Sequence, residues 1–305
     1  MSLKQHLTAC FFFLILAVNS VVFTLPFYFI ILFKFLPFEA TKKACSAILN
    51  WLAEGWISVI HWGIHHMLPT HWEITIPDNL CLEKWRLVIC NHQSATDTAA
   101  LFYVFNKKIP FIKFFIKDQL KWVPLLGVAW VGLDYPRMKR YSKKVLAKKP
   151  HLKGRDIEFT KKFCERFKRK PTTILNFVEG TRFSKSKQKK SPYQHLLQPR
   201  AGGIAYVLTC MGEQIREVLD ITITYPDNRK TLWEFLGGTV SRIHVEAKIN
   251  TTLLEAMPDD YFHDIPGQDK FKAALNALWE EKDQQMNRII SSTITKPAKT
   301  SPRQT

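Results

Sequence analysis

The first pattern along the chain is a long apolar stretch. No formally charged side chain occurs between Leu7 and Phe33, a span of 27 residues. As a continuous helix this stretch would measure about 40 Å, more than the roughly 30 Å of a bilayer's hydrocarbon core. It is also longer than the apolar region of a secretory signal, which argues against cleavage. We therefore predict an apolar membrane helix over residues 7–36, with Pro26 allowing one tilted span or a bent, re-entrant pair.

A second apolar stretch, residues 44–67, carries a single formal charge, at Glu54. Its apolar residues recur at helical spacing, so one face of the helix is apolar throughout. Tryptophan prefers the headgroup depth of a membrane, and this stretch contains Trp51, Trp56 and Trp62. We predict an interfacial amphipathic helix, with a second membrane span as the alternative. We expect no metal site in this stretch, because no completing cysteine or carboxylate lies beside its histidines, His61, His65 and His66.

After Pro69 the pattern changes to short β-rich runs that alternate with helical ones. The runs that predict strands are 72–76, 87–90, 111–116, 173–178, 219–224 and 243–248. The runs that predict helices are 97–105, 157–168, 202–211 and 270–290. This alternation predicts an α/β domain over residues 69–290, a mixed sheet flanked by helices, with residues 1–68 as an N-terminal helical membrane anchor. Residues 291–305 are rich in Ser, Thr, Pro and Lys, and we expect a disordered tail.

The chain is strongly basic, with 44 Lys and Arg against 26 Asp and Glu among 305 residues and a formal charge of +18. This excess predicts an anionic partner. Nine of the nineteen residues from 137 to 155 are Lys or Arg, and a second basic run covers residues 185–190. Nucleic-acid binding would favour aromatic side chains between the charges, and the first run offers only Tyr141. We therefore expect the basic runs to meet anionic membrane lipids, and we expect no nucleic-acid partner.

Candidate chemistry first occurs directly after the predicted strand at 87–90. Residues 91–97 read Asn-His-Gln-Ser-Ala-Thr-Asp, and we name them the His-Asp segment. His92 and Asp97 would not share one face of a straight helix. If the residues between them form a turn, however, Asp97 can accept from one imidazole nitrogen and leave the other free as a base. The structural alternative is that Asn91 or Asp97 caps the next helix.

A second polar segment lies at the end of the predicted strand at 173–178. Residues 176–183 read Asn-Phe-Val-Glu-Gly-Thr-Arg-Phe, and we name them the Glu-Arg segment. In an open sheet, the strand ends border the ligand crevice. The pattern H-x-x-x-x-D followed about ninety residues later by F-V-E-G-T-R resembles the glycerolipid acyltransferase family, whose prototype is 1-acylglycerol-3-phosphate acyltransferase.

Two further blocks extend the resemblance to roughly residues 69–226. Residues 133–137 (Leu-Asp-Tyr-Pro-Arg) lie where the family has its acceptor-binding block, which ends in Arg. Residues 223–226 (Ile-Thr-Tyr-Pro) stand where the family has an apolar block that ends in Pro. The strings at 117–120 and 135–141 look most like the bacterial YihG-type acyltransferases.

The resemblance implies a membrane-bound O-acyltransferase with the glycerolipid acyltransferase fold. It would transfer a fatty acyl group from acyl-CoA or acyl carrier protein to the sn-2 hydroxyl of lysophosphatidate, which gives phosphatidate, and would need no other cofactor. His92 would act as the general base, because an alcohol is a poor nucleophile at neutral pH, and Asp97 would fix the imidazole tautomer. A covalent route through Ser94 is an alternative. There are two alternative functions: acylation of a different lysophospholipid, or a non-catalytic role as a basic adaptor at the membrane surface.

The same resemblance assigns the remaining site residues. The acceptor would be held by Arg137, Glu179, Gly180, Thr181 and Arg182, with Lys139 and Arg140 as alternatives to Arg137 for the phosphate. Backbone N–H groups near the two segments would stabilise the oxyanion. No metal is implied.

The charges flanking the apolar stretch predict the orientation of the chain. Lys34, Lys42 and Lys43 follow the stretch, whereas only Lys4 precedes it. By the positive-inside tendency, the C-terminal flank stays in the cytoplasm. Six cysteines without a C-x-x-C pair also suit a reducing compartment and argue against a zinc ribbon. We expect a catalytic domain on the cytoplasmic side of a membrane, in the bacterial case the inner membrane.

Overall fold

The computed structural model describes residues 1–117, 122–123, 126–135, 137–138, 170–227 and 231–295. The predicted helix at 157–168 lies outside the described residues, and so do Lys139, Arg140 and the rest of the first basic run beyond Met138. Part of each string that resembles the YihG type also lies outside them.

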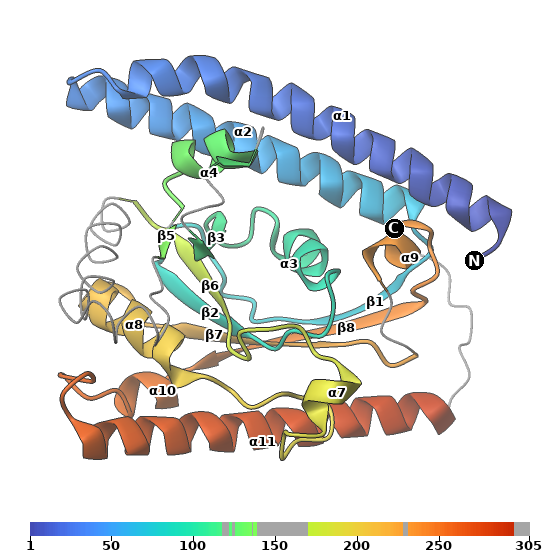
Figure 1. Cartoon of the computed structure of the whole chain (residues 1–305), viewed down its shortest axis with the longest axis vertical. Helices are drawn as coiled ribbons and strands as arrows, with labels where there is room; N and C mark the ends of the chain where they lie inside the picture. The colour runs from blue at the N-terminus through green and yellow to red at the C-terminus, as the bar shows by residue number, and fades with distance from the viewer. Residues whose placement is uncertain (118–121, 124–125, 136, 139–169, 228–230, 296–305) are drawn as a thin grey trace, which may run out of the picture.

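A six-stranded sheet forms the centre of the domain (Figure 1). Its order is β1-β8-β7-β2-β6-β3, with β1 at His71–Thr75, β2 at Arg86–Cys90, β3 at Ile112–Phe114, β6 at Thr173–Phe177, β7 at Val218–Thr224 and β8 at Arg242–Asn250. The pairs β2–β6 and β2–β7 are parallel, whereas β7–β8 is antiparallel. The predicted α/β domain with a mixed sheet is therefore confirmed.

One strand prediction is wrong in its extent. The run at 111–116 divides into β3, which joins the main sheet, and β4 at Ile116–Lys117, which pairs with β5 at Arg137–Met138. Apolar residues continue through both strands, so the hydrophobic pattern alone cannot show where the chain leaves one sheet for the other.

Helices cover both faces of the sheet (Figure 1). One face carries α3 at Asp97–Phe105, with α4 at Leu126–Gly132 and the long helices α1 at Leu3–Lys34 and α2 at Glu39–Met67 beyond it. The opposite face carries α8 at Ala201–Met211, α10 at Thr252–Glu255 and α11 at Ile265–Thr295. The short helices α7 and α9 span Lys185–Gln188 and Leu232–Leu236, and a 3-10 turn spans Gly212–Gln214. Strand β2 lies between both layers and all five of its residues are buried, as is typical of a parallel strand covered on two sides.

The C-terminal helix is longer than the sequence predicts. Helix α11 continues to Thr295, five residues into the stretch that we expected to be a disordered tail, and residues 296–305 lie outside the described part. Its apolar side, with Phe271, Leu275 and Trp279 buried, packs under the sheet. This packing stabilises the helix beyond what its composition indicates.

The two N-terminal helices form an antiparallel pair. Helix α1 spans Leu3–Lys34 as one helix through Pro26, and α2 spans Glu39–Met67. The rings of Phe12 and Phe23 lie against Gly63 and Gly55, where a Cβ atom would come within 3.0 and 2.5 Å of them. These two glycines therefore allow the helices to approach closely. In Figure 1, α2 lies between α1 and the rest of the domain.

Both ends of α1 are attached to the domain. At its start, the backbone of Gln5 packs on Gly237, and His6 accepts a hydrogen bond from the indole of Trp233 in α9 at 3.3 Å. At its end, Lys34 forms a 2.6 Å ion pair with Asp134. Helix α1 therefore lies along the domain and does not project from it (Figure 1).

Candidate functional site

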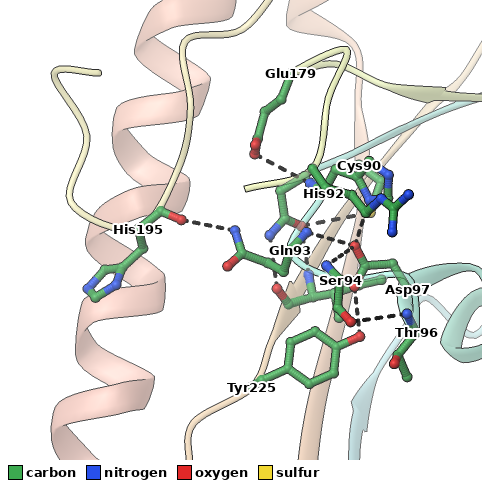
Figure 2. A network of polar contacts seen from close by, with 12 residues as sticks. Cys90, His92, Gln93, Ser94, Thr96, Asp97, Glu179, His195 and Tyr225 are labelled. Carbon is green, nitrogen blue, oxygen red and sulfur yellow. Dashed lines mark hydrogen bonds and ion pairs between the residues drawn. The ribbon is translucent and has the colours of Figure 1, made fainter. Parts of the chain in front are cut away.

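The candidate site lies where three neighbouring strands end. Strands β7, β2 and β6 are adjacent and parallel, so their carboxyl ends meet at one edge of the sheet. His92 follows β2, Glu179 follows β6 and Tyr225 follows β7. Figure 2 shows these three side chains around the turn that leads into α3. The two segments that lie about ninety residues apart in the sequence are thus brought together.

The central contact joins His92 and Asp97. The imidazole Nδ1 lies 2.9 Å from Asp97 Oδ2. The aspartate side chain is completely buried, whereas the histidine side chain is 17% exposed. The His92 ring also stacks on Phe177, with centroids 4.0 Å apart and planes 14° apart. The predicted turn is therefore present, and it leaves the imidazole at the border between the core and solvent.

The other contacts of Asp97 decide which nitrogen of His92 carries the proton. Its Oδ2 accepts the backbone N–H groups of Gln93 at 2.7 Å and Ser94 at 2.9 Å, and its Oδ1 accepts the hydroxyl of Tyr225 at 2.7 Å. A carboxyl group surrounded by donors acts as an acceptor, which is the pattern of the ionised form. Nδ1 of His92 then donates as N–H, and Nε2 keeps the lone pair of a base.

The polar side chains around this pair are hydrogen-bonded to other parts of the protein. Asn91 binds the backbone of Ile223 through both its amide N–H and its carbonyl oxygen, each at 2.9 Å, so it joins β2 to β7 and does not cap α3. The Gln93 amide donates to the carbonyl of His195 at 2.9 Å (Figure 2). Ser94 is buried and accepts from the backbone of Thr96. This buried position counts against the covalent route.

The oxyanion prediction needs a correction in the His-Asp segment. The N–H groups of residues 92, 93 and 94 donate to the carboxyl oxygens of Glu179 and Asp97. Those of Thr96 and Asp97 bind Ser94. These donors are thus already bonded within the protein, where they hold the turn together.

Glu179 is almost fully buried beside the turn, with 1% of its surface exposed. Its Oε1 accepts the backbone N–H of His92 at 3.4 Å. Burial raises the pKa of the Glu179 carboxyl from 4.5 to about 8, against the lowering effect of the backbone N–H groups that it accepts. Glu179 is therefore largely a neutral acid at pH 7, one that supports the backbone of His92.

The rest of the Glu-Arg segment turns outward. Gly180 has a φ of +67°, a left-handed conformation that favours glycine, and it lies against the Arg200 side chain. Thr181 accepts a hydrogen bond from Lys187 of α7 at 2.6 Å, and the same ammonium donates to the Arg182 carbonyl at 3.1 Å. Arg182 itself is exposed. The segment thus presents a guanidinium to solvent next to a fixed turn.

Two further predictions concern Arg137 and the histidines of α2. Arg137 lies in β5, but its side chain is outside the described part, so its role stays a prediction. Among the described residues no group of three or more His, Cys, Asp or Glu could hold a metal ion. His61 packs on Tyr103 instead, with its Nδ1 2.9 Å from the Tyr103 carbonyl oxygen.

Sequence reasoning missed the role of Tyr225. The residue stands in the block at 223–226, which was read only as apolar, yet its hydroxyl contacts Asp97. Its place directly after a parallel strand, like that of His92 and Glu179, was the available signal.

Comparison with known proteins gives a consistent picture. The family model described as Acyltransferase matches residues 71–266, which include both segments. The chain is 26% identical over 186 residues to the mouse 1-acyl-sn-glycerol-3-phosphate acyltransferase delta, covering 56% of this chain and 43% of that protein. It is 25% identical over 249 residues to the 2-acyl-1-lysophosphatidylinositol acyltransferase of Saccharomyces cerevisiae, covering 69% of this chain and 63% of that protein.

A solved structure, the PlsC 1-acyl-sn-glycerophosphate acyltransferase of Thermotoga maritima, aligns with a TM-score of 0.43 at 15% identity, over 93% of this chain and 100% of that one. The chain spans less than two thirds of the length of the curated relatives above. The family model nevertheless covers residues 71–266 of 305, well over half of the chain, and the protein therefore belongs to the Acyltransferase family.

Proposed function

We propose that the protein is a membrane-bound O-acyltransferase that acylates the sn-2 hydroxyl of lysophosphatidate with acyl-CoA or acyl carrier protein as donor. The observation that carries this proposal is the His92–Asp97 pair. The 2.9 Å contact of Nδ1 with Asp97 supports a proton on Nδ1, which leaves Nε2 as a base on a partly exposed ring. A chain of the Acyltransferase family with such a base is suited to activate an alcohol.

The reaction follows from the position of that base. Nε2 of His92 takes the proton of the acceptor hydroxyl as its oxygen attacks the thioester carbonyl. The carbon–oxygen bond forms, the carbon–sulfur bond breaks, and the thiolate leaves with the proton from the imidazolium. The Asp97 carboxylate stabilises the imidazolium between these steps, as the aspartate does in a serine-protease triad. No acyl-enzyme is required.

The basic groups beside the turn suit anionic substrates. Arg182 is exposed next to Gly180, and it can bind the acceptor phosphate through charge-assisted hydrogen bonds, with Arg137 as the second candidate. Lysines 185, 187, 189 and 190 in and after α7 are also exposed, and no Asp or Glu occurs between Glu179 and Glu213. This cationic surface suits the phosphates of coenzyme A or the acidic surface of a carrier protein.

A thioester-consumption assay tests the activity and its substrates. The purified full chain in phosphatidylglycerol vesicles receives a panel of lysolipids with acyl-CoA or acyl carrier protein. We expect the highest kcat/KM with lysophosphatidate. A preference for lysophosphatidylinositol, the acceptor named for the yeast relative, would replace the acceptor but keep the reaction. Absence of transfer to every acceptor would support the non-catalytic adaptor.

Membrane attachment is supported by the outward face of α1. This helix is the only described one that is long and apolar enough to cross a membrane. Its exposed large apolar side chains include Leu7, Phe11, Leu14, Val18, Val22, Leu25, Phe29 and Leu32. Because both ends of α1 are attached to the domain, we propose that the helix embeds parallel to the membrane surface and that α2 supports it from the domain side.

A vesicle sedimentation assay tests this arrangement. Replacing Phe11 and Phe29 together by Glu should release most of the protein from anionic vesicles, because two charges would enter the apolar layer. Ile265→Glu is the control, since Ile265 is also an exposed apolar residue, at 69% against 58% for Phe11 and 67% for Phe29, but lies at the start of α11. Equal release of both variants would refute embedding through α1.

We also propose that the catalytic domain lies on the cytoplasmic side of the membrane, on the basis of Lys34, Lys42 and Lys43 after the apolar stretch. Protease added outside intact cells should spare residues 70–290 if the domain is cytoplasmic. Digestion of that region from outside would show the opposite orientation. Placement in a bacterial inner membrane, and closeness to the YihG type, rest on the sequence strings alone.

A further inference from the structure

The hydroxyl of Tyr225 lies in the core and reaches the candidate site from the side opposite to His92. Tyr225 is 5% exposed, and its ring belongs to the cluster between the sheet and α3. Its hydroxyl donates to Asp97 Oδ1 at 2.7 Å, while Oδ2 faces His92 (Figure 2). Because the Asp97 side chain is fully buried, its Oδ1 does not accept hydrogen bonds from solvent. A buried tyrosine hydroxyl normally has a partner, and here that partner is the aspartate.

The strand that carries Tyr225 is fixed to the His-Asp segment. The side chain of Asn91 both donates to and accepts from the backbone of Ile223, two residues before Tyr225. Asn91 is itself fully buried, so water competes little for these bonds. Tyr225 and Asp97 are therefore positioned relative to each other through the backbone as well as through their direct hydrogen bond.

We propose that Tyr225 is a positioning residue for the acyl-transfer site: its hydroxyl orients the Asp97 carboxylate toward Nδ1 of His92 and moderates its basicity. The inference rests on the proposed function. A hydrogen bond to the charged form stabilises a carboxylate, so the donation makes Asp97 a weaker acceptor for the imidazole proton. Nε2 then remains unprotonated over a wider range of pH. Loss of the hydroxyl leaves Oδ1 without this donor, whereas the N–H groups of Gln93 and Ser94 still hold Oδ2, so the carboxylate attracts the imidazole proton more strongly.

The surrounding titratable groups do not replace this contact. Burial and the neighbouring Asp97 raise the pKa of the Tyr225 hydroxyl well above 10, so it stays a donor. Cys90, from β2, is fully buried and its thiol pKa is also raised, first by burial. Glu179 faces the backbone of His92 from the β6 side, and Lys282 of α11 is paired with Asp220. Tyr225 is thus the neighbour whose side chain meets the free oxygen of Asp97.

Tyr225→Phe removes only the hydroxyl, and a spectroscopic readout separates positioning from folding. The full chain in vesicles is labelled with 15N at histidine, and His92→Ala identifies the His92 signals. We expect the Tyr225→Phe variant to show a higher His92 pKa, and its kcat to fall about tenfold with the acid limb of the pH–rate profile moved to higher pH. Tyr193→Phe is the control, because that hydroxyl binds a backbone carbonyl of α11 at 3.3 Å.

A double-mutant cycle completes the test. In an Asp97→Asn background, Tyr225→Phe should have no further effect on the His92 pKa, because the tyrosine acts through the aspartate. An unchanged or lower His92 pKa in the single variant would overturn the inference. The imidazole spectrum does not need turnover. If Tyr225→Phe raises the His92 pKa but the wild-type chain acylates no lysolipid, the positioning role of Tyr225 is upheld and the proposed function is rejected. If the wild-type chain is active but Tyr225→Phe changes neither the His92 pKa nor kcat, the proposed function is upheld and the positioning role is rejected.

Discussion

The His-Asp segment and the Glu-Arg segment both follow parallel strands, but they differ in how their polar groups are used. In the first, the side chains of Asn91, Ser94 and Asp97 are buried and bonded to the protein itself. In the second, Glu179 is buried, whereas Arg182 faces solvent. A base must hold one orientation and one tautomer, which burial and hydrogen bonds enforce. A group that recognises a charged lipid must be reached from outside, which requires exposure.

The sharpest test of this difference removes the base. His92→Ala should lower kcat by about a thousandfold, because general-base catalysis is lost while the buried turn keeps its aspartate. Membrane binding and melting temperature should change little. His263→Ala is the control, since that histidine side chain is 84% exposed and pairs with Asp260 nearby in the sequence. Undiminished turnover in the His92 variant would refute the mechanism.

The second test asks whether Asp97 serves catalysis as well as the turn. Asp97→Asn should lower kcat by about a hundredfold or more, because an amide favours the wrong imidazole tautomer and cannot stabilise the imidazolium. It should also lower the melting temperature, because two backbone N–H groups and Tyr225 lose a charged acceptor. A less stable variant with wild-type kcat would restrict Asp97 to a structural role.

A smaller effect is expected from replacing Arg182 in the Glu-Arg segment, and it should change KM and not kcat. Arg182→Ala should raise the KM for the acceptor about tenfold and leave the KM for the donor nearly unchanged. The control is Arg216→Ala, which removes the same charge from another exposed position. Equal changes in the two KM values would mean that Arg182 does not bind the acceptor phosphate.

The last test concerns stability and Glu179, the buried carboxyl group of the second segment. The pKa of Glu179 is raised from 4.5 to about 8, so between these values the folded chain holds a proton that the unfolded chain has released. Stability should therefore fall as pH rises through this window, by on the order of 5 kcal/mol, and level off above it. Melting curves of Glu179→Gln should lack this component. Parallel pH profiles for the variant and wild type would show that Glu179 is not protonated in the fold.

Part of the fold could be predicted because its signals are local. The strand at 87–90 and the helix at 97–105 were found within a residue of β2 and α3, since a buried parallel strand is a continuous apolar run and a short helix has a clear period. The extent of α11 was not found, because residues 291–295 are rich in Ser and Thr, whereas the packing that stabilises this helix lies further back, between Phe271 and Met286.

The sequence by itself determined the chemistry that is available: a histidine and an aspartate in one turn, a glutamate and an arginine in another, and an apolar N-terminal stretch. Only the tertiary structure decided how these groups are used. Parallel pairing of β2 with β6 and β7 brings Glu179 and Tyr225 to the His92–Asp97 pair. Attachment at both ends lays α1 along the domain. Such contacts join residues far apart in the chain, and spacing and periodicity describe only neighbours along it.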